Sequence, residues 1–128
     1  MKKTSLIALS AMFFMFTSHA EAACGQSETT YYLVKNGKVS KKTTESSSCG
    51  NMNGVFISFD FSENLNLVSG SKFDDKGETS EEYFQFNVNQ VPKEPLNVAR
   101  PKGVPSSFEC YTYSEKPEVA YCVNFSEF

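Results

Sequence analysis

The chain has 128 residues, of which 40% are hydrophobic and 21% charged, and its formal net charge is −3. This length suits one small domain, and the absence of a basic stripe argues against a nucleic-acid interface. There is no Trp, and the only histidine is His19, which lies in the leader described next. Without an imidazole after that leader, a Ser-His-Asp or Cys-His nucleophile is excluded, and so is the commonest zinc ligand.

Residues 1–22 are predicted to be a cleaved secretory signal peptide. Lys2 and Lys3 give a positive start, and Leu6–Phe16 is an apolar run of eleven residues. The segment Ala20-Glu21-Ala22 puts small residues at the −3 and −1 positions of a cleavage site. Cleavage after Ala22 is preferred and cleavage after Ala20 is the second choice.

Two other readings of the leader are weaker. Eleven apolar residues are too few for a membrane anchor, which needs about 20. A lipoprotein acylated on Cys24 would place Glu21 at a normally apolar site and would leave an odd number of cysteines. We therefore expect release into the periplasm or the medium and a single domain, residues 23–128. Loss of Lys2, Lys3 and Glu21 leaves ten Lys plus Arg against fourteen Asp plus Glu, a balance of −4.

A long first hairpin is predicted around Asn36-Gly37, the strongest short signal for a two-residue type I′ turn. In that register the numbers of opposed residues always add up to 73, and Cys24 and Cys49 satisfy the rule. They fall in the non-hydrogen-bonded class of pairs, where side chains lie closest. An even cysteine count in an exported small domain indicates disulfides, so we predict a Cys24–Cys49 bridge.

The middle of the chain predicts three more strands, separated by turns. Val55–Ser62 alternates, with Val55, Ile57, Phe59 and Phe61 on one face; Leu65–Phe73 is a shorter strand with Gly70 as a bulge or end. Asp74–Gly77 is a turn, and Glu81–Gln90 alternates again, with Phe84, Phe86 and Val88 inward. The expected core is Phe56, Phe59, Phe61, Leu65, Leu67, Phe84, Phe86, Val88, Phe108 and Val123.

A proline-rich segment, residues 91–107, separates these strands from a last hairpin. It carries four of the five prolines, so we expect extended, solvent-facing chain without a central strand. In the last hairpin, a five-residue connection over Ser114–Glu118 pairs Tyr113 with Val119 and Cys110 with Cys122, which predicts the second disulfide. The fold class is therefore all-β, a small antiparallel sandwich or barrel of about six to seven strands with two disulfides.

Chemistry within the chain is sparse. The doublets Asp74-Asp75 and Glu81-Glu82 are typical of turns and strand starts, and neighbours on a strand point to opposite faces, so no catalytic residue is assigned. Asp74–Glu78 departs from calcium-loop spacing, and we expect neither a metal nor a cofactor. A cross-linked frame, a stiff proline segment and tyrosines at 31, 32, 111, 113 and 121 suit a binding protein, although cross-strand tyrosines also stabilise hairpins.

In size, export signal and cysteine layout, the whole chain resembles the periplasmic immunity proteins of Vibrio type VI secretion systems. Those proteins guard against the peptidoglycan-degrading domain of a VgrG spike effector. The resemblance implies an inhibitor that binds and occludes a muramidase-like effector protein in the periplasm.

A local likeness concerns Val68–Phe73 (VSGSKF), which is similar to the S-G-x-[KR]-[YF] motif of periplasmic inhibitors of c-type lysozyme. Ser69, Gly70, Lys72 and Phe73 match it. The second motif of that family, a tryptophan followed by Lys-Gly, keeps only Lys76-Gly77. A general lysozyme inhibitor is therefore an alternative, and a plain bulged strand and turn explains the same residues.

Both likenesses imply a plug that occludes a peptidoglycan hydrolase. We expect the strand end at Ser69–Asp75 to make the contact, with the proline segment as second choice. Hydroxyls and a lysine would face the carboxylates of the hydrolase, and acidic groups would face a cationic rim. The expected contact residues are Ser69, Ser71, Lys72, Asp74, Asp75, Glu81 and Glu82.

An alternative of another class is an exported structural or adhesive β-domain that pairs through a sheet edge. Its candidate strand is Val123–Phe128. A homodimer through such an edge is compatible with the inhibitor reading as well.

Overall fold

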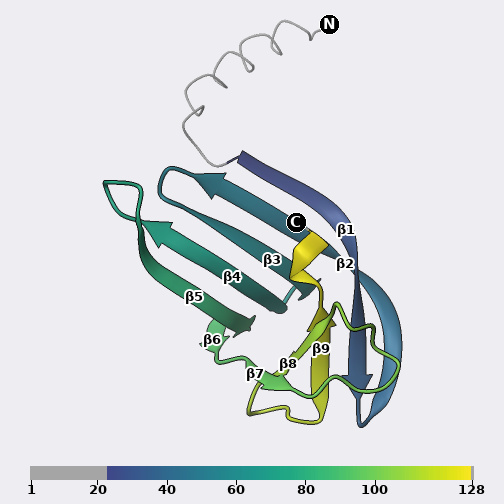
Figure 1. Cartoon of the computed structure of the whole chain (residues 1–128). Helices are drawn as coiled ribbons and strands as arrows, with labels where there is room; N and C mark the ends of the chain where they lie inside the picture. Colours follow the sequence, from purple (N-terminus) through teal and green to yellow (C-terminus); the bar gives the residue numbers. More distant parts are fainter. Residues whose placement is uncertain (1–22, 128) are drawn as a thin grey trace, which may run out of the picture.

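One antiparallel sheet of nine strands is the frame of the computed structural model, which describes residues 23–127 (Figure 1). The predicted signal peptide lies outside these residues. The strands run in the spatial order β6-β5-β4-β3-β2-β1-β9-β8-β7. Their bounds are β1 Ala23–Lys35, β2 Lys38–Asn51, β3 Gly54–Ser62, β4 Leu65–Phe73, β5 Thr79–Val88, β6 Val91–Lys93, β7 Leu96–Val98, β8 Glu109–Thr112 and β9 Val119–Val123.

The first hairpin has the predicted register along its whole length. Asn36 and Gly37 both have positive φ, 51° and 82°, as a type I′ turn requires. Pairing continues from Lys35↔Lys38 to Cys24↔Cys49 without a slip. The Cys24–Cys49 disulfide is therefore confirmed. The Cys110–Cys122 disulfide is confirmed too, and it joins opposed residues of β8 and β9.

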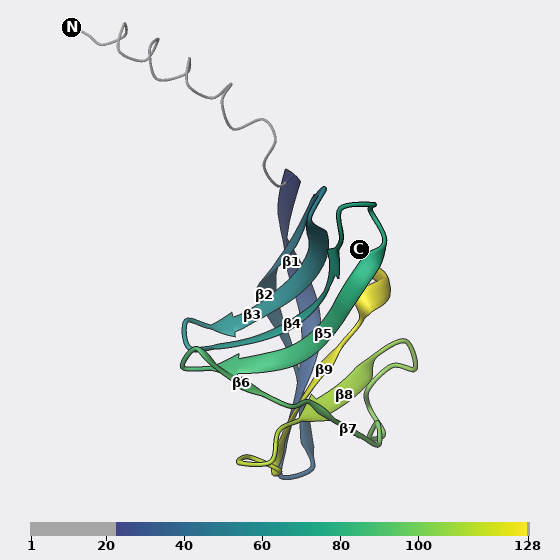
Figure 2. The same ribbon diagram turned by 90° about the vertical axis from the view of Figure 1, so that its left-hand side faces the viewer.

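The curl of the sheet makes a half-barrel, whose hollow side holds the main core (Figure 2). Alternation sends Phe59, Leu67 and Phe86 to that side, where all three are fully buried. Tyr31, Tyr113 and Val123 complete the cluster. Tyr31 and Tyr113 are thus core residues, which corrects the expectation that they supply aromatic surface.

A second, smaller cluster lies on the other side of β1 and β9. Val104 and Phe108 cover Val34 and the Cys110–Cys122 bridge there. They belong to the chain between β7 and β8, so this part of the proline-rich region packs as a cover. Tyr32 meets Phe108 edge-on, with ring centroids 5.0 Å apart.

The predicted strand count of six to seven is wrong, because the proline-rich segment contributes β6 and β7. Both are three residues long and form the two edges of the sheet. An edge position is where a strand tolerates proline, since one side needs no ladder hydrogen bonds. The turn before β6 is a second two-residue turn with positive φ, at Asn89 and Gln90, and the sequence reading extended the preceding strand across it.

The C-terminal segment does not form the free strand considered for an adhesive domain. Residues 119–123 are β9, paired on both sides by β1 and β8. A short 3-10 helix, Phe125–Glu127, follows, and Phe125 packs on Phe59 with ring centroids 5.3 Å apart.

In the last hairpin, the predicted pairing of Tyr113 with Val119 is absent. The strand β8 ends at Thr112, whose hydroxyl donates to the carbonyl of Val119 (2.7 Å). No helix within residues 23–127 is long and apolar enough to cross a membrane.

Candidate functional site

The predicted contact residues gather at one end of the sheet, which we call the distal end. It comprises the β2–β3 turn at residues 52–53, the β4–β5 loop at residues 74–78, and the strand ends beside them (Figure 1). Antiparallel pairing places Ser71 opposite Glu82 and Lys72 opposite Glu81. The two turns are joined by a hydrogen bond from the Phe73 N–H to the Asn53 carbonyl (2.8 Å).

On the core side, the distal end is hollow. Each of β3, β4 and β5 contains one fully buried core residue. Toward the distal end, the next residues on the same face are Ile57, Ser69 and Phe84, followed by Val55, Ser71 and Glu82. These six side chains and Ser48 of β2 line a hollow of about 700 Å³. We call it the concave hollow.

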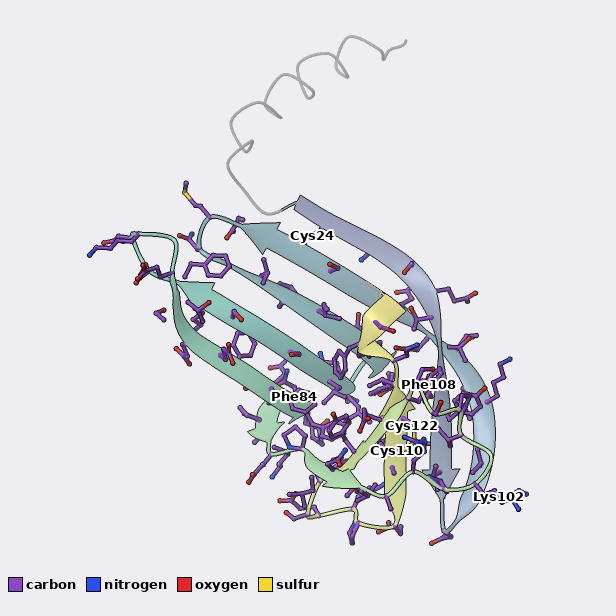
Figure 3. All side chains as sticks on the ribbon, in the orientation of Figure 1. Cys24, Phe84, Lys102, Phe108, Cys110 and Cys122 are labelled. Atoms are coloured by element: carbon purple, nitrogen blue, oxygen red, sulfur yellow. A yellow bond between two sulfur atoms is a disulfide. The ribbon has the colours of Figure 1, made fainter. Side chains whose placement is uncertain are left out.

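The hollow exists because the elements that fill the half-barrel stop short of its distal end. Phe84 marks the boundary, since it meets Tyr111 edge-on at 4.9 Å and Phe125 at 5.8 Å between ring centroids. Figure 3 shows that the Cys110–Cys122 bridge lies far from Cys24. Beyond Phe84, Val55 remains 44% exposed.

Lys72 and Glu81 point to the opposite face. They form an ion pair (3.8 Å) with both side chains largely exposed. Lys72 also lines a second hollow of about 470 Å³, with Phe56 and Tyr83. Of the predicted contact residues, Ser69, Ser71 and Glu82 thus line the concave hollow. Lys72 and Glu81 lie on the outer face of the sheet.

The acidic loop residues divide into a structural and an exposed member. The Asp74 carboxylate accepts hydrogen bonds from the N–H groups of Lys76 and Glu78, both at 2.9 Å. It therefore holds the loop, which also needs the positive φ of Gly77 (81°). Asp75 is exposed at the tip of the loop.

Charge is distributed unevenly along the long strands. Residues 72–82 contain five Asp or Glu and two Lys, a balance of −3. The opposite end, residues 35–42 around the Asn36-Gly37 turn, carries four Lys and no acid. Lys102 lies near that end as well (Figure 3). The distal end is therefore the acidic pole of the molecule.

The sequence did not predict the apolar floor of the hollow: it placed Val55 and Ile57 only on the same face as Phe59, and it assigned Phe84 to the core. Phe56, also expected in the core, lies on the outer face, because it alternates with the buried Phe59. The alternating pattern correctly predicted which face of β3 and β5 these residues occupy. It could not predict how far β8, β9 and the C-terminal 3-10 helix extend over that face. No group of His, Cys, Asp or Glu in residues 23–127 has the arrangement of a metal site.

Gly70, in the segment similar to the lysozyme-inhibitor motif, has a packing role. A Cβ at this position would lie 2.4 Å from the Tyr83 hydroxyl and 2.8 Å from the Cβ of Phe56. On the outer face, Cys24, Cys49, Phe56, Gly70 and Tyr83 form one row across five strands. The glycine lets the Tyr83 ring lie over β4.

Comparisons of the chain with known protein families, with curated proteins and with solved structures found no match.

Proposed function

We propose that this chain is a periplasmic immunity protein, an inhibitor that binds a peptidoglycan-degrading, muramidase-like effector and occludes its groove. The observation that carries the proposal is the distal end. There, serine hydroxyls, an apolar floor and a single carboxylate share one open hollow on a cross-linked frame. A rigid frame loses little entropy on binding, which favours tight inhibition.

The arrangement suits a binder better than an enzyme. Glycosidic hydrolysis needs two carboxyl groups flanking one bond. Glu82 is the only charged residue among those lining the concave hollow, and Glu81 points to the other face. By contrast, Ser69 and Ser71 can donate hydrogen bonds to the carboxylates that line a muramidase groove.

The two disulfides agree with a target outside the cytoplasm. Two disulfides indicate an oxidising environment outside the cytoplasm, where peptidoglycan is found. The resemblance in size, leader and cysteine layout to type VI immunity proteins supports an effector as the target. The motif around Gly70 supports the general lysozyme inhibitor less well, because Gly70 is explained by Tyr83 and Lys72 is paired with Glu81.

The test is a hydrolysis assay on purified peptidoglycan, with residues 23–128 produced in oxidised form. We expect stoichiometric inhibition of the muramidase domain of a type VI spike effector encoded beside this gene, and none of c-type lysozyme. Inhibition of c-type lysozyme alone would favour the general inhibitor. Absence of inhibition in both assays, or glycan cleavage by the domain itself, would overturn the proposal.

A further inference from the structure

We infer that the concave hollow receives a protein loop that carries an arginine or lysine flanked by apolar side chains. The inference rests on the proposed function, because it names the chemistry of the partner at the same site. It also decides which face of the distal end makes the contact.

The first step is the floor of the hollow. Val55 and Ile57 of β3 and Phe84 of β5 present aliphatic and aromatic surface, and Val55 is 44% exposed. Apolar side chains on the floor of an open hollow favour an occupant with apolar groups of its own. The volume of about 700 Å³ is in the range of pockets that enclose a few side chains.

The second step is charge. Glu82 is an exposed carboxylate that lines this apolar and hydroxyl-lined space, and it has no ion pair among the described residues. Its neighbour Glu81 is paired with Lys72. The whole distal end has a balance of −3 over residues 72–82. A cationic side chain entering the hollow would meet one carboxylate inside it and an acidic rim outside it, and this field also speeds encounter. Arginine fits best, because its planar guanidinium can bond a carboxylate and donate to serine hydroxyls at the same time.

The third step separates a protein loop from a saccharide, which also binds hydroxyls and aromatic rings. A sugar platform needs a free ring, but Phe84 already makes edge-to-face contacts with Tyr111 and Phe125, with ring centroids 4.9 and 5.8 Å apart. A neutral sugar also gains nothing from the acidic rim. The charge and the apolar floor together favour the basic loop.

The experiment is a selection of disulfide-constrained loops from a random displayed library against residues 23–128. Selected loops are then measured by titration calorimetry against the wild type, Glu82→Gln and Glu81→Gln. The two variants make the same change at adjacent positions on opposite faces of β5, so Glu81→Gln is the matched control. Retained disulfides and unchanged urea midpoints verify that each variant is folded.

We expect arginine or lysine to be enriched at one position of the selected loops, and Glu82→Gln to weaken their binding about tenfold or more while Glu81→Gln changes it less than twofold. Selection of loops without a basic residue, equal losses in both variants, or failure to select any loop would overturn the inference. So would chitotetraose that shifts the amide resonances of Ser69, Ser71 and Glu82 and displaces the loops.

This result can be told apart from failure of the proposed function. The library contains no hydrolase, so loop binding that depends on Glu82 can be observed even if the hydrolysis assay shows no inhibition. Conversely, if the Glu82→Gln variant still inhibits the hydrolase, the immunity function stands, but the concave hollow is not where the hydrolase binds.

Discussion

Gly70 illustrates how one residue sets the shape of the distal end. It lies opposite Tyr83 in the register of β4 and β5, and the Tyr83 ring occupies the space that a side chain at this position would take. Glycine normally weakens a strand, but an aromatic ring from the neighbouring strand can cover it. Gly70 therefore supports the outer face, while Ser69 and Ser71 on either side of it line the concave hollow.

Replacing this glycine tests the packing. Gly70→Ala is expected to lower the free energy of unfolding by about 1–3 kcal/mol, because Tyr83 and Phe56 must both move. Gly25→Ala is the control, since its Cβ would meet nothing within 4 Å. Urea unfolding followed by fluorescence measures both. The double variant with Gly70→Ala and Tyr83→Ala should lose less free energy of unfolding than the two single variants lose together, because both changes relieve the same contact. Equal losses at Gly70 and Gly25 would contradict the packing role.

At the level of elements, the two hairpins differ in how their disulfides are protected. Cys24 is exposed near the start of β1, and β1 pairs with β9 only from Tyr32 to Lys35. Over residues 24–31, no strand within the described part of the chain covers the outer edge of β1. Cys110 and Cys122, by contrast, are 1% and 0% exposed under Val104 and Phe108.

The difference predicts an order of reduction. In increasing dithiothreitol under native conditions, Cys24–Cys49 should open first, because a thiolate can reach it without unfolding. Cys110–Cys122 should open only with global unfolding. Alkylation followed by peptide mapping measures the order. Loss of the first bridge should cost about 2–4 kcal/mol, and simultaneous opening of both bridges would contradict the difference in protection.

For the whole molecule, the core depends on tyrosines that must stay neutral. Tyr31, Phe61 and Tyr121 pack together, with ring centroids of Phe61 4.8 and 4.7 Å from those of the two tyrosines. Burial raises the pKa of Tyr121 to about 12, with smaller contributions from Tyr113 and Tyr31. Burial also raises the pKa of Tyr31. Ionisation of these hydroxyls therefore opposes the folded state.

The resulting pH dependence has a definite sign. The unfolded chain loses the Tyr121 proton near pH 10 and the folded chain near pH 12, so stability is full below pH 10 and falls as the pH rises toward 12. Tyr121 alone should account for about 1–2 kcal/mol after allowance for solvent screening. Urea midpoints between pH 9 and 12 measure the fall. Tyr121→Phe should flatten it, and an unchanged slope in that variant would contradict the assignment.

Local chemistry was sufficient for much of the frame. The Asn36-Gly37 turn fixes a register, and this register alone pairs Cys24 with Cys49, because a two-residue turn leaves no freedom in which residues oppose one another. Alternation likewise predicted which faces of β3 and β5 point inward. The proline-rich segment was misjudged because an edge strand needs hydrogen bonds on one side only, and whether a segment lies at an edge depends on the order of all strands.

The candidate site depended on tertiary structure to a greater degree. The sequence by itself determined that residues 69–82 form a polar strand end, and that Glu81 and Glu82 point to opposite faces. Only the tertiary structure decided that Ser69, Ser71 and Glu82 share a hollow with Val55 and Phe84. The reason is physical: a hollow is space that other elements leave unfilled, and it depends on how far β8, β9 and the C-terminal 3-10 helix extend over the sheet.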